Sequence, residues 1–304
     1  MKIIRHIDGS CPIKDPVVAL GNFDGLHLGH QELIKKTVEK SRAIDGTPVL
    51  FTFYPHPLKV VSPGKEPLII QSFKEKVRIA EKLGIKVVVC VRFTPEFASL
   101  EPELFVEEIL LKRLSVRCVC VGHDYTFGKD AKGGVKTLKE LSKRFDFELI
   151  VIPPVKIDGM VVSSTAIREF LRKGDVVNAN RFLGRPYRIS GYVRKGAGRG
   201  STFGFPTANI YPKGGVIVMD GVYAGYAYVD SKKYRAAINV GTNPTFKGTT
   251  RHVEAFLIDF SSNIYGKRME IDFIDFIRPE KRFRRIDDLV RQIKRDVEEV
   301  KKRL

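Results

Sequence analysis

The chain has 304 residues, 43% of them hydrophobic, so it can bury a sizeable core and more often forms two domains than one. It has no stretch near the roughly 18 consecutive apolar residues of a membrane span, and residues 1–15 do not have the pattern of a secretory signal. With 53 Lys and Arg against 35 Asp and Glu, the net charge is +18. This charge favours anionic partners, or it reflects a charge-rich, solvated surface of the kind common in heat-stable proteins.

The cysteines bear on the cellular compartment. Three of the four lie in apolar, strand-like runs, and no C-x-x-C pair occurs. The four are Cys11, Cys90, Cys118 and Cys120. This pattern predicts reduced core thiols in a cytoplasmic protein rather than a disulfide framework or a zinc site.

The first part of the chain, to about residue 183, alternates short apolar runs with helical patterns. The runs are nearly continuously apolar and β-branched, which is typical of strands buried on both faces. They cover residues 17–23, 48–54, 85–93, 116–122 and 147–153, and helical spacing covers residues 30–44, 74–84, 104–114 and 135–145. The alternation predicts an α/β fold, an open parallel sheet with helices on both faces, whose ligands bind at the carboxyl ends of the strands.

From about residue 187 the pattern changes to short strands separated by Gly, Pro and Asn turns, which predicts a small antiparallel β-barrel. The expected strands cover residues 187–193, 207–212, 221–229, 234–241, 252–260 and 267–277. A closing helix carries an apolar stripe that docks on a core, formed by Ile286, Leu289, Val290, Ile293, Val297, Val300 and Leu304. Gly184 and Pro186 mark the junction, so we expect domains at 1–183 and 187–304.

The first expected strand runs into the turn G-N-F-D-G-L-H-L-G-H. Gly21 and Gly25 permit backbone turns that a Cβ would obstruct, and the helix after Gly29 offers N–H groups and positive potential to a phosphate. His27 and His30 can add donors from the same side. Two imidazoles without Cys, Asp or Glu partners at metal spacing make a poor zinc site. The sequence has no G-x-x-x-x-G-K-[ST] loop, so this is not a Walker-type ATP site.

A second polar cluster precedes another expected helix. Ser163, Ser164 and Thr165 form an N-cap cluster, which places Arg168 in the first turn, where its guanidinium can bind phosphate. The alternative is an ordinary cap with a solvated arginine.

In the barrel half, Thr207 and Asn209 lie two residues apart, so on a strand they face the same side. Their neutral oxygens suit Mg²⁺, which shares its coordination shell with ATP phosphates; the alternative is a pair of surface strand residues. The basic, glycine-rich loop 194–204 either folds over phosphates or forms a hairpin tip. Loop 239–246 is a further Gly/Pro/Asn loop, for which turn chemistry alone is a sufficient explanation.

The expected strand at 252–260 contains one misplaced carboxylate. Period two places alternate residues on one face, namely His252, Glu254, Phe256, Ile258 and Phe260. Glu254 therefore lies on the side that we expect to be buried. A carboxylate there must be paired, must guard a sheet edge or must be functional.

The motifs in chain order resemble a known family. H-L-G-H (27–30) is similar to the H-x-G-H signature of nucleotidylyltransferases, and class I aminoacyl-tRNA synthetases carry a similar one. Together with TFYPHP (52–57), VGHDYTFG (121–128) and VSSTAIREFL (162–171), it makes the whole chain resemble the bacterial bifunctional riboflavin kinase/FAD synthetases. The resemblance implies a Rossmann-like nucleotidylyltransferase domain that adenylylates FMN and a barrel that phosphorylates riboflavin, both with ATP and Mg²⁺.

The resemblance also implies roles for individual residues. In the adenylyltransferase, His27, His30 and Arg168 would be catalytic, and ATP would be bound by Gly21, Phe23, Asp24, Gly29, Ser164 and Thr165. The flavin would be contacted by His56, Asp124 and Tyr125. In the kinase, Gly204, Thr207 and Asn209 would bind Mg-ATP, with Thr207 and Asn209 as metal ligands and Glu254 as the catalytic residue.

Two alternatives remain open. A basic nucleic-acid-binding protein would interleave aromatics with its basic clusters, whereas the run at 278–287 contains only Phe283. An adenylate-forming enzyme of another nucleotidylyltransferase class would share the H-x-G-H, but no K-M-S-K-S-like loop follows the expected sheet. We therefore expect a cytoplasmic enzyme whose partners are riboflavin, FMN and ATP, without a nucleic-acid or membrane partner.

Overall fold

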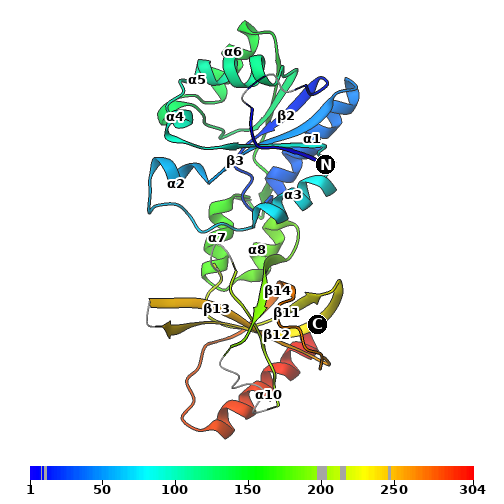
Figure 1. Ribbon diagram of the computed structural model, residues 1–304, viewed down its shortest axis with the longest axis vertical. Coiled ribbons are helices and arrows are strands. Elements are labelled where there is room, and N and C mark those ends of the chain that lie inside the picture. Colours follow the sequence, from blue (N-terminus) through cyan, green and yellow to red (C-terminus); the bar gives the residue numbers. More distant parts are fainter. Residues whose placement is uncertain (8, 10–11, 197–203, 213–216, 246–247) are drawn as a thin grey trace. The chain divides into compact units, whose positions relative to one another are not determined.

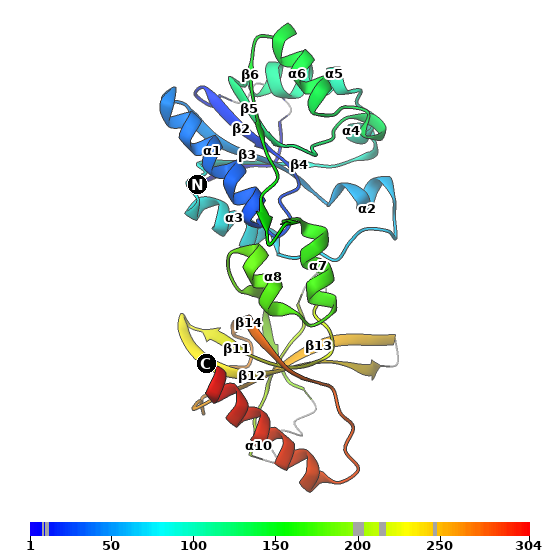
Figure 2. The ribbon, with the colours of Figure 1, turned by 180° about the vertical axis from the view of Figure 1, so that it is seen from behind.

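The computed structural model describes residues 1–7, 9, 12–196, 204–212, 217–245 and 248–304 (Figures 1 and 2). The chain divides into two compact units, Met1–Pro67 with Phe73–Val162, and Leu68–Ser72 with Ser163–Leu304. Cys11, most of the basic loop at 194–204 and the end of the loop at 239–246 lie outside the described residues.

The first unit is built on a six-stranded sheet in the order β1-β4-β3-β2-β5-β6. Its strands are β1 (Lys2–Ile4), β2 (Pro16–Leu20), β3 (Thr47–Tyr54), β4 (Val87–Arg92), β5 (Cys118–Gly122) and β6 (Glu148–Ile152). Each neighbouring pair in this order runs parallel. The α/β prediction is confirmed, and the edge strand β1 is an addition to it.

Helices cover both faces of this sheet (Figures 1 and 2). The helices of this unit are α1 (Leu28–Ala43), α2 (Pro57–Val61), α3 (Phe73–Lys82), α4 (Pro95–Ala98), α5 (Pro102–Leu104), the π-helical η1 (Phe105–Arg113), the 3₁₀ turn η2 (Lys129–Ala131) and α6 (Val135–Arg144). A short hairpin of β7 (Lys156–Ile157) and β8 (Met160–Val161) follows β6.

Two apolar cores lie on the opposite faces of the sheet. Successive residues of β2 alternate between them: Val18 and Leu20 pack with η1 and α6, whereas Val17 and Ala19 pack with α1 and α3. Both faces of the sheet are therefore covered by apolar side chains. This explains why polar and apolar residues do not alternate along these strands. Cys90, Cys118 and Cys120 are buried free thiols within the second of these cores.

The second unit begins with two helices, α7 (Ser164–Arg172) and α8 (Val176–Leu183). A closed antiparallel barrel follows in the order β10-β13-β12-β11-β14-β9. Its strands are β9 (Tyr187–Arg194), β10 (Ala208–Ile210), β11 (Gly221–Val229), β12 (Lys232–Thr245), β13 (Gly248–Leu257) and β14 (Arg268–Pro279), and the chain ends in α10 (Ile286–Arg303). The predicted barrel with its C-terminal helix is confirmed.

Aromatic rings fill the barrel, and α10 covers part of its outer surface. Tyr187, Tyr223 and Phe273 are at most 2% exposed, and the Phe273 ring contacts the rings of both tyrosines. Val297 and Val300 of α10 pack outside the barrel, in a cluster that includes Ala224 and Ile258. The predicted apolar stripe therefore docks through Ile293, Val297, Val300 and Leu304, whereas Ile286 at the start of the helix is 61% exposed.

The helices α7 and α8 pack on the barrel. Asn180 of α8 donates through Nδ2 to the Phe273 carbonyl (2.8 Å) and accepts through Oδ1 from the Tyr187 amide (2.6 Å). Met219 donates its amide to the Leu171 carbonyl at 3.0 Å. Contacts thus divide the chain between Val162 and Ser163. The domain limits 1–183 and 187–304 remain a prediction.

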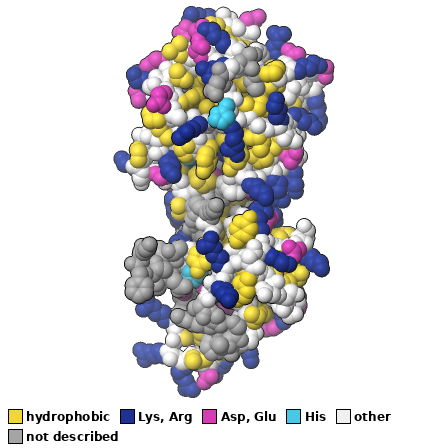
Figure 3. Space-filling model, in the orientation of Figure 1, with side chains coloured by type: hydrophobic (Ala, Val, Ile, Leu, Met, Phe, Trp, Pro, Cys, Tyr) yellow, Lys and Arg dark blue, Asp and Glu magenta, His cyan; other side chains and the backbone are white. Residues whose placement is uncertain are grey.

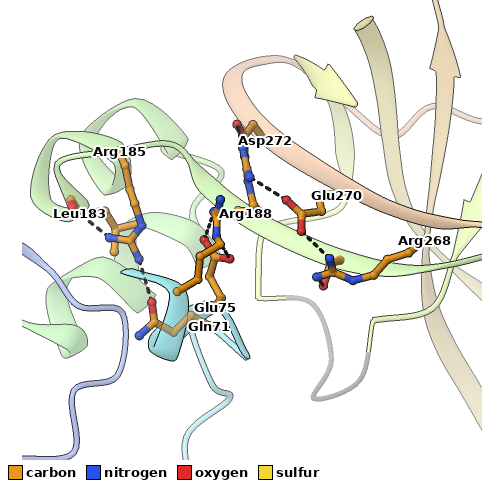
Figure 4. Close-up of polar contacts among 10 residues, drawn as sticks. Gln71, Glu75, Leu183, Arg185, Arg188, Arg268, Glu270 and Asp272 are labelled. Carbon is orange, nitrogen blue, oxygen red and sulfur yellow. Dashed lines mark hydrogen bonds and ion pairs between the residues drawn. The ribbon is translucent and has the colours of Figure 1, made fainter. Parts of the chain in front are cut away.

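An ion-pair network joins β9 to β14 on the barrel surface (Figure 4). Arg188 and Asp272 face each other in register, and Arg188 Nη2 donates to Asp272 Oδ2 at 2.6 Å. Arg188 also binds Glu270, which binds Arg268 in turn, both at 2.7 Å. The Arg188 guanidinium lies 4.5 Å from the Tyr228 ring centre. Arginine at this position therefore serves the barrel's own strand pairing.

Charge is dispersed on the face drawn in Figure 3, where Lys and Arg lie among acidic, polar and apolar side chains. In the part of the chain that the structure describes, no helix is long and apolar enough to cross a membrane.

Candidate active sites

The first candidate site lies at the carboxyl edge of the parallel sheet. The strands β3, β2 and β5 are neighbours and run parallel. The segments that leave them carry His56, the Gly21 turn and Asp124, respectively. Three separate stretches of sequence thus arrive at one edge, where ligands of open α/β sheets bind.

The turn after β2 is held in a left-handed backbone. Phe23 has φ +50°, Gly25 +88° and Leu26 +40°. Such angles are rare for large side chains and persist where the surroundings enforce them. The Gly21 amide donates to the Phe51 carbonyl (3.2 Å), and the Thr52 hydroxyl donates to the Asn22 carbonyl (3.2 Å). The strand β3 therefore fixes the path of the turn.

His27 and His30 form a stacked pair at the start of α1. His27 is the N-cap, and its Nδ1 accepts the His30 amide at 3.4 Å. The two ring centres are 3.7 Å apart with planes inclined by 22°. A Cβ at Gly29 would lie 3.3 Å from the His27 ring, so glycine leaves room for that ring against the first helical turn. The helix begins at Leu28, two residues before the predicted start.

The cap determines what His27 can do. Because its Nδ1 is an acceptor, the neutral ring carries its proton on Nε2, where it is a hydrogen-bond donor. His27 is 7% exposed and Asp24 4%. The His30 ring also contacts Phe23, with 5.2 Å between ring centres. The structure thus brings His27, His30, Phe23 and Asp24 together at one helix start.

The two flanking loops differ from each other. His56 caps the short helix α2 through its Nδ1, which accepts the Leu58 amide at 3.3 Å. Asp124 is exposed, whereas Tyr125 packs against the sheet core and stacks on Phe127 with 5.8 Å between ring centres. Burial raises the pKa of the Tyr125 hydroxyl. Of the two predicted flavin-binding residues in this loop, Asp124 is exposed and Tyr125 is partly buried.

The Ser/Thr cluster caps α7 in the second unit. The N-cap is Ser163, whose hydroxyl accepts the Ala166 amide at 3.2 Å, and Ser164 and Thr165 begin the helix. Arg168 lies five residues in, is 7% exposed, and donates through Nε to the Leu68 carbonyl at 2.9 Å. The alternative of a solvated arginine is wrong. Its predicted place in the first turn is wrong too, because the helix starts at Ser164.

The second candidate site is a polar row on the barrel's outer surface. Asn209 of β10 pairs in register with Glu254 of β13, and Glu254 pairs on its other side with Asn239 of β12. Asn209 is 5% exposed, and the Glu254 side chain is 28% exposed. Three neighbouring strands therefore present an amide, a carboxylate and an amide side by side.

Both oxygens of Glu254 have partners. The Thr207 hydroxyl donates to Oε2 at 3.4 Å, and His252 Nε2 lies 3.2 Å from Oε1. His252 is 4% exposed, and its ring centre is 6.3 Å from that of Tyr211. The predicted pair Thr207 and Asn209 and the separately predicted Glu254 thus form one cluster. Gly204 also lies in the segment before β10, with φ +82°.

The expected burial of β13 must be corrected. Val253, Ala255 and Leu257 are at most 4% exposed and point into the barrel. The face that carries Glu254 and Phe256 points outward, and Phe256 packs against the cluster under α10. The period-two pattern holds for His252, Glu254 and Phe256, whereas Ile258 and Phe260 lie beyond the end of the strand, and the face that carries Glu254 is partly open. Glu254 is therefore available to a ligand.

The oxygens of this cluster fit a magnesium ion. Thr207 uses its hydroxyl proton on Glu254, so lone pairs on that oxygen remain for a cation. The Asn209 amide oxygen adds a second hard donor. A Cβ at Gly196 would lie 2.5 Å from Asn209 Nδ2, so the start of the basic loop passes directly over this amide.

His252 and Asn239 were not identified as site residues from the sequence. The period-two pattern already placed His252 beside Glu254, so a buried histidine next to a carboxylate was a usable signal. Asn239 lies within the Gly/Pro/Asn loop region, and only the strand register reveals that it faces Glu254.

Two family models match the chain. The model described as FAD synthetase matches residues 12–166, and the model described as riboflavin kinase matches residues 183–304. The bifunctional riboflavin kinase/FMN adenylyltransferase of Escherichia coli (strain K12) is 34% identical over 299 residues, which cover 97% of this chain and 96% of that protein. The Bacillus subtilis (strain 168) protein of the same name is 37% identical over 292 residues, 93% of this chain and 90% of that protein.

A solved structure is similar along nearly the whole chain. It is titled as a macrolide-efflux protein from Streptococcus pneumoniae, with a TM-score of 0.88 and 34% identity, and the match covers 98% of each chain. This likeness confirms that both units and their order belong to an architecture already seen in a crystal.

Proposed function

The chain belongs to the family of bifunctional riboflavin kinases/FMN adenylyltransferases, and we propose that each activity uses one of the two clusters described above. The barrel makes FMN from riboflavin and ATP. The H-x-G-H cluster transfers the adenylyl group of ATP to FMN, giving FAD and pyrophosphate. The H-x-G-H cluster follows a strand of the parallel sheet, and the Glu254 cluster lies on strands of the barrel. Each reaction therefore has its own site.

For adenylyl transfer, an oxygen of the FMN phosphate attacks the α-phosphorus of ATP, and the bond to the β-phosphate oxygen breaks as pyrophosphate leaves. No proton has to move to or from the protein. The protein supplies orientation and donors for charge that develops on the phosphates. His27 and His30 are the donors, beside the first amides of α1. Gly21, Phe23, Asp24 and Gly29 shape the turn that holds them.

The remaining predicted contacts of this site are part of the proposal. Ser164 and Thr165 at the start of α7 bind ATP, and Arg168 stabilises phosphate charge. His56 and Asp124 contact the flavin from the neighbouring loops, together with Tyr125. Support for the loops comes from their place at the edge where ligands of parallel sheets bind.

For phosphoryl transfer, Glu254 accepts the proton of the ribityl primary hydroxyl while that oxygen attacks the γ-phosphorus of ATP and ADP leaves. Thr207 and Asn209 would hold Mg²⁺, which would neutralise charge on the ATP phosphates, and Gly204 lies in the segment before β10 that would approach the nucleotide. His252, at 3.2 Å, fixes the direction of the carboxylate. The single observation that carries the assignment is the Thr207–Glu254–His252 chain beside Asn209.

Magnesium binding gives a direct test. We expect Thr207→Val to raise the Mg²⁺ concentration needed for FMN formation about 10–100-fold, the usual loss of affinity when a group that supports a metal site is removed. FAD formation from supplied FMN should keep the parent Mg²⁺ dependence. Titrating Mg²⁺ in the two half-reactions measures both. An unchanged Mg²⁺ requirement for the kinase would remove Thr207 from the metal site.

The two units allow a second test. A fragment of residues 163–304 should fold, phosphorylate riboflavin and fail to adenylylate FMN, because the barrel has its own core and closing helix. A fragment of residues 186–304 should melt at a lower temperature, because it loses both hydrogen bonds of Asn180. Thermal melts and flavin chromatography report these results. A folded 163–304 fragment without kinase activity would contradict a self-contained kinase unit.

The localisation and partners follow from this function. We propose a cytoplasmic enzyme that acts on small molecules, without a nucleic-acid or membrane partner. The dispersed charge on the face in Figure 3 agrees with this view. The exclusion of a nucleic-acid partner would fail if the protein were retained on DNA in a salt-sensitive manner.

A further inference from the structure

A buried lysine lies under the turn that carries the H-x-G-H motif. Lys76 of α3 is 8% exposed, and its Nζ donates to the Asn22 carbonyl at 2.6 Å and to the Thr52 hydroxyl at 3.3 Å. Burial lowers the pKa of Lys76, and the nearby Asp24 carboxylate opposes that effect. A buried ammonium group is costly unless oxygens replace its water. The three oxygen-bearing neighbours all belong to the turn or to the strand beside it.

The contact fixes one peptide plane. The Asn22 carbonyl accepts from both Lys76 and Thr52. In a trans peptide the C=O and the next N–H point in opposite directions, so holding the Asn22 oxygen also sets the direction of the Phe23 amide. Phe23 is the residue with φ +50°. A phenylalanine in the left-handed region needs such enforcement from its surroundings.

The Phe23 ring contacts the His30 ring, so the position of Phe23 affects that of His30. The Phe23 side chain is fully buried, and its ring would lie 3.3 Å from a Cβ at Gly21. On its other side it contacts the His30 ring, which stacks on His27. A continuous series of contacts therefore runs from Lys76 through Asn22 and Phe23 to His30.

We propose that Lys76 is a positioning residue for adenylyl transfer: it holds the Asn22 carbonyl and thereby keeps Phe23, and with it the His30 ring, in the geometry that meets the phosphates. This inference rests on the proposed role of His30. Lys76 does not contact the reacting atoms; it acts through the turn. Its loss should lower the turnover number more than the substrate affinity, because the ring would still be present but misplaced.

The test compares two lysines of the same helix. Lys76→Met keeps the length of the side chain and removes the donor, and we expect it to lower kcat for FAD formation about 10–100-fold with KM for ATP and FMN changed less than about threefold. Lys74→Met makes the same chemical change at an exposed position of α3 and should keep parent kinetics. FMN formation should stay at the parent rate in both.

A double-variant cycle separates positioning from a general structural role. If Lys76 acts through His30, Lys76→Met should cost less than about threefold in a His30→Ala background, because variants along one series of contacts are not additive. A full additional loss in that background would overturn the proposal, as would parent kcat in Lys76→Met. If His30→Ala alone left FAD formation intact, the proposed function of the site would fail instead.

Thr52→Val supplies a second route to the same answer. It removes the other donor to the Asn22 carbonyl without changing side-chain shape, so a smaller loss of kcat that again vanishes with His30→Ala is expected. If Lys76→Met does not fold, Thr52→Val tests instead whether the Asn22 carbonyl positions His30. Parent kcat in a folded Thr52→Val variant would then count against control of the turn through the Asn22 carbonyl.

Discussion

Glu254→Gln is expected to lower FMN formation by about 10²–10⁴-fold, the usual contribution of a general base. The amide keeps the shape of the carboxylate but cannot accept the proton of the ribityl hydroxyl. The fold should tolerate the change, because a Gln side chain can still hydrogen-bond Thr207 and His252, whose hydroxyl and ring can each donate or accept. KM for riboflavin and Mg-ATP should change little, and FAD formation from supplied FMN should stay at the parent rate.

Glu270→Gln is the matched control for this prediction. Glu270 is also a partly buried carboxylate of the barrel, with its side chain 18% exposed and paired to Arg188 and Arg268. It should lower the melting temperature and leave kinase turnover per folded molecule intact. If Glu254→Gln behaved in the same way, Glu254 would be a structural ion-pair residue and not the base. Melting curves and the two separate half-reactions distinguish these results.

The fold could be predicted because its strongest signals are local. Continuous β-branched runs and short turn-bounded strands each identify one kind of sheet, whatever the rest of the chain does. The strand β1 was missed because three residues carry no pattern. The packing of α7 and α8 on the barrel could not be predicted for a different reason. It depends on Asn180 meeting Phe273 and Tyr187, which no periodicity reveals.

The sites were predictable in part, because residue type and spacing can be read from the sequence and burial cannot. His27, His30, Thr207, Asn209 and Glu254 lie in recognisable strings. The orientation of β13 was misjudged because both of its faces are covered, one by the barrel interior and the other partly by the cluster under α10. Lys76 looks like one of many solvated lysines in sequence, and only its contact with Asn22, 54 residues away, shows otherwise.

His30→Ala is expected to lower FAD formation about 10²–10³-fold, the scale for one donor lost from a site that stabilises developing charge. FMN formation by the same molecules should stay at the parent rate, because the barrel performs that step. His6→Ala removes an exposed histidine of the same unit and should leave both rates unchanged. Rates of the two half-reactions at saturating substrate measure the effect, and a variant that makes FAD at the parent rate would contradict the role of His30.

The size of the loss of FAD formation in His30→Ala also distinguishes a slower reaction from partial unfolding. His30 stacks on His27 and contacts Phe23, so its removal costs some stability of the turn. Partial unfolding of the first unit would lower FAD formation in proportion to the unfolded fraction and would appear as an earlier melting transition. A loss of a hundredfold at a temperature well below that transition requires a rate effect in folded molecules. Because the Nδ1 of His27 is committed to the helix cap, His30 is the member of the pair whose ring can be removed while the helix start keeps its cap.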